Sequence, residues 1–268
     1  MKVRIWGIAL CVAVAALSST AVARADLAPG VSPPGSNDWS CKPSAQRPYP
    51  VVLVHGTFAD MTVSWNLISP VLAMDGYCVF ALDYGNRGTG RIEDSAAQLS
   101  NFVDRVLAAT GAARVSLVGH SQGGMMPRYV IKFLGGKSKV EDLIGLVPSN
   151  HGTTNPLAPP AGEFGCVSCV QQAAGSDFLQ NLNAGDETPG NVSYTQVTTR
   201  YDEVVIPYRS AYLAAGPRTT NVTLQDRCPL DLTDHLGIIY DSVAVRWMLN
   251  ALERPGPADP NFRPSCLP

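Results

Sequence analysis

Val115-Ser-Leu-Val-Gly119-His-Ser121-Gln-Gly123 joins a short apolar run to a serine that stands between two glycines. The pattern is G-x-S-x-G, and the flanking residues predict a strand before the serine and a helix after it. Glycine is needed on both sides because so sharp a turn clashes with larger side chains and demands strained backbone angles. The turn lifts the Ser121 hydroxyl clear of the sheet, so we interpret Ser121 as a nucleophile rather than part of an ordinary glycine-serine turn.

Strand-like and helix-like segments alternate on both sides of this motif. The expected strands are short apolar or alternating runs at 50–54, 78–82, 115–119, 143–148, 194–199 and 221–224. The expected helices span 65–74, 92–110, 122–134 and 241–252. This alternation predicts an α/β fold with a mainly parallel central sheet and helices on both faces.

The chain is expected to contain one folded domain. Residues 26–49 are rich in Pro, Gly and Ser and are expected to form an irregular lead-in. No linker separates two domains after residue 50, so residues 50–268 are interpreted as a single domain. This domain includes an insertion at 152–190, which precedes the fifth expected strand.

The composition excludes several classes of protein. The 268 residues are 46% hydrophobic and 16% charged, with a formal net charge of −2. A nearly neutral chain without runs of Lys or Arg has no electrostatic footprint for nucleic acid and no polybasic membrane anchor. The apolar fraction and the lack of a repeating period exclude disorder, collagen, coiled coils and repeat arrays.

The first 25 residues have the pattern of a signal peptide. Lys2 and Arg4 precede an apolar run at 5–17, and Ala23-Arg24-Ala25 is a small-residue cleavage site. A transmembrane anchor needs about 20 apolar residues, so we expect secretion and no integral membrane span. Cleavage after Ala25 also removes Cys11, and the 6 Cys that remain favour disulfides in an exported protein.

A serine nucleophile needs a base and a carboxylate that orients it. The chain has only 4 His, and His235 is the one that fits the chain order Ser…Asp…His. The alternative is a helix-capping histidine near Gly237. Asp202 directly follows the fifth expected strand and is assigned as the carboxylate, with Glu203 as its nearest rival because a one-residue error in the turn exchanges the two.

The oxyanion of a tetrahedral intermediate needs backbone donors. The amide of Gln122, at the start of the expected helix, is one candidate. The other is the amide of Thr57, in the loop His55-Gly56-Thr57 after the first expected strand. The alternative for this loop is a simple turn that ends the strand.

These residues together carry a family resemblance. His55-Gly56-Thr57, Gly119–Gly123, Tyr201–Val205 and Asp234-His235 resemble the secreted class 2 bacterial lipases of the α/β-hydrolase superfamily, and more loosely the fungal lipase B type. The resemblance spans roughly residues 41–252, and the serine motif is its most specific part. It implies the α/β-hydrolase fold.

The resemblance also implies a disulfide framework. In the fungal type a Cys before the first strand pairs with one that opens the next, which implies Cys41–Cys78. A Cys upstream of the catalytic His pairs with one near the C-terminus, which implies Cys228–Cys266. Cys166 and Cys169 are then left to pair with each other, and this pair departs from the fungal pattern. We interpret this C-x-x-C as a loop staple, with a redox motif as the alternative.

The insertion at 152–190 is expected to wall an acyl pocket above Ser121. A mobile lid is the alternative to a fixed wall stapled by Cys166–Cys169. Its apolar residues suit a fatty acyl chain, because each buried methylene gains about 0.8 kcal/mol. No cofactor and no metal are expected, since the sequence contains no His-x-x-x-His pair and the cysteines have other uses.

The function expected from these residues and the resemblance is that of a secreted serine carboxylic-ester hydrolase, a lipase or esterase. It would cleave acylglycerol or similar apolar esters through an acyl-enzyme on Ser121, acting as a monomer on a small-molecule ester or lipid, including lipid at an oil–water interface. The alternatives are a polyester hydrolase or acyltransferase with the same triad, an amidase, and a non-catalytic binding protein on a hydrolase scaffold.

Overall fold

The computed structural model describes residues 29–267, so the expected signal peptide at 1–25 and its cleavage site lie outside the described residues. Within this range the chain forms a six-stranded parallel sheet with the order β2-β1-β3-β4-β5-β6. The strands are β1 Val51–Val54, β2 Val79–Leu82, β3 Val115–His120, β4 Val140–Leu146, β5 Ser193–Thr198 and β6 Thr219–Thr223. A parallel sheet covered by helices confirms the expected α/β-hydrolase class of fold.

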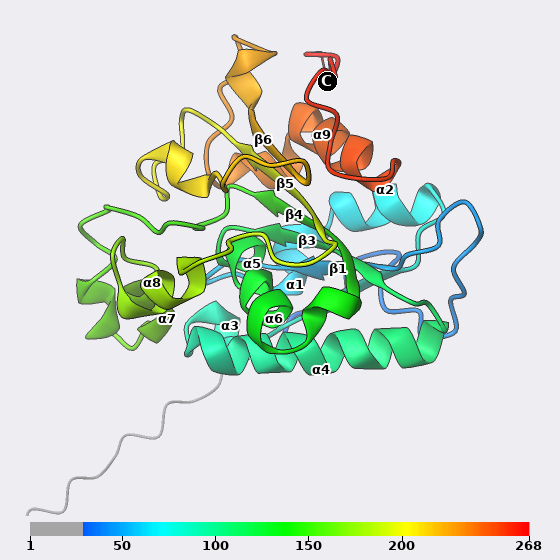
Figure 1. The fold of residues 1–268 in the computed structure, drawn as a ribbon, viewed down its shortest axis with the longest axis horizontal. Coiled ribbons are helices and arrows are strands. Elements are labelled where there is room, and N and C mark those ends of the chain that lie inside the picture. The colour runs from blue at the N-terminus through cyan, green and yellow to red at the C-terminus, as the bar shows by residue number, and fades with distance from the viewer. Residues whose placement is uncertain (1–28, 268) are drawn as a thin grey trace, which may run out of the picture.

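Helices cover both faces of this sheet (Figure 1). The α-helices of the described residues are α1 Met61–Trp65, α2 Ile68–Met74, α3 Gly85–Gly88, α4 Ile92–Thr110, α5 Gln122–Met125, α6 Pro127–Phe133, α7 Val167–Gln171, α8 Asp177–Asn183 and α9 Ser242–Leu252. Short 3₁₀ turns lie at η1 Gly136–Ser138, η2 Pro160–Gly162, η3 Tyr208–Ala211, η4 Leu224–Asp226 and η5 Gly237–Tyr240.

The two faces of the sheet belong to two separate hydrophobic cores. On one face, Phe80 and Leu117 pack with Leu99 of α4 and Val130 of α6. On the other, Val118 and Ile144 pack with residues of α2 and α9, among them Leu72, Trp247 and Met248. Successive side chains of a strand point to opposite faces, so strands buried on both sides are apolar throughout, as in β1.

Some element boundaries differ from those expected from the sequence. The expected helix at 65–74 corresponds to α2, which begins at Ile68, and a separate short helix, α1, precedes it. α1 begins at Met61 because Asp60 caps it by accepting a hydrogen bond from Val63 N at 2.8 Å. The expected helix at 122–134 is divided into α5 and α6 at Met126, since Pro127 has no amide hydrogen to continue the ladder. The fourth strand begins earlier, at Val140, and ends at Leu146, because Val147 turns the chain with a φ of 46°.

The segment before β1 covers the edge of the sheet. β2 is an edge strand, and the amide of Asn37 donates to Val79 O at 2.9 Å. The Asn37 side chain accepts from the amide of Ala81 at 3.0 Å, so it mimics a neighbouring strand. The Cys41–Cys78 disulfide joins the same two segments.

Two further disulfides lie within the described residues, Cys228–Cys266 and Cys166–Cys169. The structure therefore contains both pairs that the resemblance implies, and the pair that was left over from it. Cys228–Cys266 attaches the C-terminal segment to the loop that follows β6. Across residues 29–267, no helix has the length and apolar character needed to cross a membrane.

Asp142 is a buried carboxyl on β4, where its Oδ2 accepts a hydrogen bond from Ser116 Oγ at 2.8 Å. Burial raises the pKa of Asp142 to about 7, and the neighbouring Glu141 adds to the shift. Below about pH 4 the carboxyl is protonated in the folded and the unfolded chain alike. Between about pH 4 and 7 only the folded chain keeps the proton, so the free energy of unfolding falls as the pH rises through this window.

We expect Asp142→Asn to flatten this pH dependence, which amounts to at most about 1.4 kcal/mol per pH unit for one proton. Denaturant titrations at pH 4 to 8 measure it. Asp104→Asn, at a half-exposed carboxyl paired with Lys139, is the control and should keep the wild-type slope. An unchanged slope in Asp142→Asn would show that another group causes the effect.

Candidate active site

Ser121 sits in a strained turn between β3 and α5. Its φ of 55° and ψ of −123° lie in a region that side chains disfavour, and its own amide donates to Leu146 O at 2.9 Å. The flanking glycines are required by space: a Cβ on Gly119 would lie 1.8 Å from Gly123 O, and one on Gly123 would lie 2.1 Å from Val54 O. The turn therefore has the geometry that the G-x-S-x-G pattern predicts, with Ser121 at the carboxyl edge of the sheet.

The loops that follow β5 and β6 bring Asp202 and His235 together. A parallel bridge between Tyr201 and Asp234 aligns the two segments, and His235 Nδ1 lies 2.9 Å from Asp202 Oδ1. Both side chains are buried. The same Asp202 oxygen accepts hydrogen bonds from the amides of Val204, at 3.0 Å, and Val205, at 2.7 Å. The carboxylate is thus fixed in the position that orients an imidazole.

Glu203 takes a different place. Its side chain is exposed, and its Oε2 accepts a hydrogen bond from the backbone amide of His235 at 3.2 Å. The geometry therefore favours Asp202 over Glu203 as the partner of the imidazole. Glu203 instead supports the main chain of the same histidine.

His120, to which the sequence analysis assigned no role, also supports His235. His120 Nε2 donates to the His235 carbonyl oxygen at 2.9 Å, and the two ring centroids are 5.0 Å apart. Burial, together with the nearby charge of a protonated His235, lowers the pKa of His120 to about 3. His120 therefore stays neutral and holds the main chain of His235. In the sequence, the signal for this role is that His120 directly precedes Ser121.

The two candidate oxyanion donors lie near Ser121. Gln122 is the first residue of α5, so its amide has no carbonyl of the helix to bond. Thr57 follows β1, and its hydroxyl donates to Gln122 Oε1 at 2.8 Å. Among residues 29–267, the amides of Thr57 and Gln122 donate to no protein acceptor, so both are free to bind a developing oxyanion.

His55 stabilises the loop that carries Thr57. The ring is fully buried and stacks on Tyr84 with a centroid distance of 4.3 Å. His55 Nδ1 donates to Gly56 O at 2.7 Å, and the Tyr84 hydroxyl donates to His55 O at 2.6 Å. Burial lowers the pKa of His55, which keeps the ring neutral in this position.

Ser121 and His235 open into one cavity of about 470 Å³. Much of its wall is apolar and comes from four segments of the chain. They contribute Phe58 near Thr57, Val204 and Val205 after Asp202, Leu236 after His235, and Leu157, Ala158 and Ala161 of the 152–190 insertion. Thr57, Gln172 and Cys169 also line it. Ser121 Oγ makes no hydrogen bond to another residue in the 29–267 range, so the cavity leaves the hydroxyl open to a ligand.

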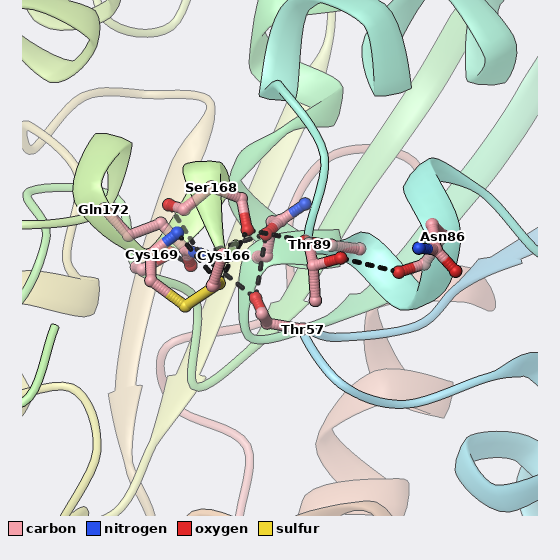
Figure 2. Close-up of a disulfide and its surroundings, with 10 residues drawn as sticks. Thr57, Asn86, Thr89, Cys166, Ser168, Cys169 and Gln172 are labelled. Carbon is pink, nitrogen blue, oxygen red and sulfur yellow. Dashed lines mark hydrogen bonds between the residues drawn. A yellow bond between two sulfur atoms is a disulfide. The ribbon is translucent and has the colours of Figure 1, made fainter. Parts of the chain in front are cut away.

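The 152–190 insertion contains η2, α7 and α8 and is joined to the scaffold by buried side chains. The Cys166–Cys169 disulfide closes the first turn of α7 beside the cavity (Figure 2). Ser168 Oγ donates to Gly88 O at 2.6 Å, and Gln172 reaches Thr57 and Gln122. These contacts favour a fixed wall over a mobile lid. Gln172 was not singled out from the sequence, because only tertiary contacts mark it.

In the part of the chain that the structure describes, no three His, Cys, Asp or Glu side chains are grouped so that they could hold a metal ion.

A parallel sheet, a strained serine between β3 and α5, and an Asp–His pair at the same sheet edge are the features of an α/β-hydrolase. The chain belongs to the lipase (class 2) family, whose sequence model matches residues 48–248.

Known relatives are similar over part of their length. A triacylglycerol lipase of Vibrio cholerae is 36% identical over 174 residues, which cover 56% of this chain and 54% of that protein. A triacylglycerol lipase of Pseudarthrobacter phenanthrenivorans is 43% identical over 94 residues, which cover 31% of this chain and 28% of that protein. The chain thus spans between about a quarter and a half of the curated relatives that it matches.

Two solved structures show the same fold. Lipase B of Aspergillus fumigatus aligns with a TM-score of 0.73 at 23% identity, covering 85% of this chain and 57% of that one. The mature form of lipase BlEst2 from Bacillus licheniformis aligns with a TM-score of 0.61 at 17% identity, covering 78% of this chain and 94% of that one.

Proposed function

We propose that the protein is a secreted serine carboxylic-ester hydrolase that cleaves acylglycerols or similar apolar esters. The observation that carries the proposal is the 2.9 Å hydrogen bond between His235 and Asp202, at the wall of the same apolar cavity into which Ser121 opens. Membership of the class 2 lipase family, and similarity to relatives named triacylglycerol lipase, support an ester substrate.

The proposed mechanism is acyl transfer to water. His235 Nε2 takes the proton of Ser121 Oγ as this oxygen attacks the ester carbonyl, and the amides of Thr57 and Gln122 bind the oxyanion. Imidazolium His235, stabilised by Asp202, then protonates the leaving alcohol. His235 next takes a proton from water, whose oxygen attacks the acyl carbonyl to give a second tetrahedral intermediate. This intermediate breaks its bond to Ser121 Oγ as His235 returns the proton to that oxygen, which releases the acid and restores the Ser121 hydroxyl.

The cavity indicates the substrate class. Leu157, Ala158 and Ala161 on one side and Val204 and Val205 on another offer apolar contact to a hydrocarbon chain. A fatty acyl chain gains about 0.8 kcal/mol for each methylene that it buries there.

Three disulfides support an exported protein, because such bonds persist in oxidising compartments. Secretion through cleavage after Ala25 is part of the proposal.

Ser121→Ala is expected to lower hydrolysis of a nitrophenyl ester by about 10⁵-fold or more, because the nucleophile is lost. It is also expected to abolish labelling by a serine-directed fluorophosphonate. Ser138→Ala, at an exposed serine of η1, serves as the control and should keep both the hydrolysis rate and the labelling of the wild type. Turnover that survives in a folded Ser121→Ala protein would overturn the assignment of the nucleophile.

Asp202→Asn is expected to lower kcat by about 10³–10⁴-fold, because an amide no longer favours the imidazole tautomer that accepts the serine proton. Glu203→Gln should have a much smaller effect, since the Glu203 carboxylate bonds the backbone amide of His235 and not its imidazole. Steady-state kinetics on a soluble ester compare the two. A larger loss in Glu203→Gln than in Asp202→Asn would reverse their roles.

A further part of the proposal is that the rim of the cavity binds a lipid surface. Phe58, Leu157 and Leu236 line the cavity and yet are 64%, 73% and 64% exposed, so apolar surface surrounds the entrance. An oil–water interface would bury these side chains.

We expect Leu157→Ser/Leu236→Ser to lower activity on emulsified triolein about tenfold more than activity on a soluble short-chain ester. Adsorption to the emulsion, measured by depletion from the water phase, should fall in parallel. The control Val31→Ser/Met74→Ser removes exposed apolar side chains outside the cavity lining and should leave the ratio unchanged. Equal losses of activity on both substrates would show that these leucines bind the substrate and do not bind the lipid surface.

A further inference from the structure

We propose that Gln172 is a positioning residue that holds the two oxyanion donors, Thr57 and Gln122, in register with Ser121. The inference rests on the proposed hydrolase function and assigns to that reaction a residue from the insertion, 51 positions after the nucleophile in the sequence. Gln172 acts through Thr57 and Gln122, because their amides are the groups proposed to bind the oxyanion.

The carboxamide of Gln172 joins four separate parts of the chain. Its Nε2 lies 3.0 Å from Thr57 Oγ1 and 2.9 Å from Gln122 Oε1, and 3.2 Å from Ser168 O of its own helix. Its Oε1 accepts a hydrogen bond from Ser149 Oγ, after β4, at 2.8 Å.

Thr57, Gln122 and Gln172 form a closed set of hydrogen bonds. The Thr57 hydroxyl donates to Gln122 Oε1 and accepts from Gln172 Nε2, which also donates to Gln122 Oε1. Gln172 and Gln122 are buried, with 7% and 0% of their surface exposed, so water does not readily replace these bonds. Loss of one partner would leave buried polar groups without a hydrogen bond.

The position of Gln172 is set by the insertion rather than by the sheet. It directly follows α7, whose first turn is closed by Cys166–Cys169. Ser168 attaches α7 to the C-terminal end of α3. Its amide donates to Thr89 O at 3.2 Å, and its hydroxyl donates to Gly88 O at 2.6 Å. Figure 2 shows Gln172 extending from this helix toward Thr57, beside the disulfide.

This arrangement matters because oxyanion stabilisation depends on distance. Donors act when they lie about 2.7–3.1 Å from the developing charge, and a displacement of about 1 Å costs roughly 100-fold in rate. Thr57 lies in a loop between β1 and α1, whereas Gln122 begins α5. Thr57 and Gln122 are 65 residues apart in the sequence, and their amides must keep a fixed distance from each other to bind one oxyanion. The Gln172 carboxamide hydrogen-bonds the side chains of both residues.

The test is Gln172→Met, which keeps an unbranched side chain of similar length and removes all four hydrogen bonds. We expect kcat on a soluble nitrophenyl ester to fall about tenfold, with KM within about twofold. The matched control is Gln171→Met. Gln171 belongs to α7, but its carboxamide bonds Ile92 N at 2.8 Å and Glu93 Oε2 at 2.7 Å, away from the oxyanion donors.

A double-mutant cycle separates positioning from general loosening of the insertion. Thr57→Val removes the hydroxyl that bonds both Gln172 and Gln122, whereas the bond from Gln172 to Gln122 stays. Gln172→Met should therefore lower kcat less in that background than in the wild type. Gln171→Met should have the same effect with or without Thr57→Val. If Gln172→Met folds poorly, Gln172→Asn tests the same point, because its amide is one methylene too short to reach both partners.

The outcomes distinguish this inference from the proposed function. If the wild-type protein neither hydrolyses esters nor reacts with a fluorophosphonate, the proposed function fails. If the wild-type protein is active and Gln172→Met or Gln172→Asn keeps the kcat of Gln171→Met, the positioning role is overturned. Additive losses in the cycle with Thr57→Val would overturn it as well.

Discussion

The site depends on the close packing of the backbone around Ser121. Gly119 and Gly123 each approach another main-chain segment so closely that a Cβ would overlap a carbonyl oxygen. This packing keeps Ser121 at a positive φ, from which its side chain enters the cavity and Gln122 begins α5 with a free amide. The positions of Ser121, of the Gln122 amide and of His120 thus follow from a single turn.

The remaining groups reach this turn because the sheet is parallel. Thr57 follows β1, Ser121 follows β3, and the segments of Asp202 and His235 follow β5 and β6, so all four lie at the same edge of the sheet. Neutral side chains then fix their positions: burial lowers the pKa of His55 and of His120, so both rings act as hydrogen-bonding groups without adding charge beside His235. Of the two histidines that line the cavity, His235 is the one paired with a carboxylate, and we propose it as the group that exchanges a proton with Ser121.

Much of the fold was predictable because its signals are local. Short apolar or alternating runs of four to six residues marked the strands, and the helical spacing at 92–110 gave the bounds of α4. The division of 122–134 at Pro127 and the early start of α1 at the Asp60 cap were missed, although both signals are in the sequence. The disulfide pairs came from a family resemblance, since spacing alone leaves 15 pairings of six cysteines open.

The sequence by itself determined the strained serine turn, the order of strands and helices, and the choice of Ser121, because each depends on residues that are neighbours in the chain. Only the tertiary structure decided that Asp202 rather than Glu203 meets the imidazole, that His120 holds the main chain of His235, and that Gln172 reaches Thr57 and Gln122. The physical reason is that these contacts join segments between 33 and 115 residues apart. Their partners are set by how loops pack at the sheet edge, and no periodicity or spacing in the chain records that packing.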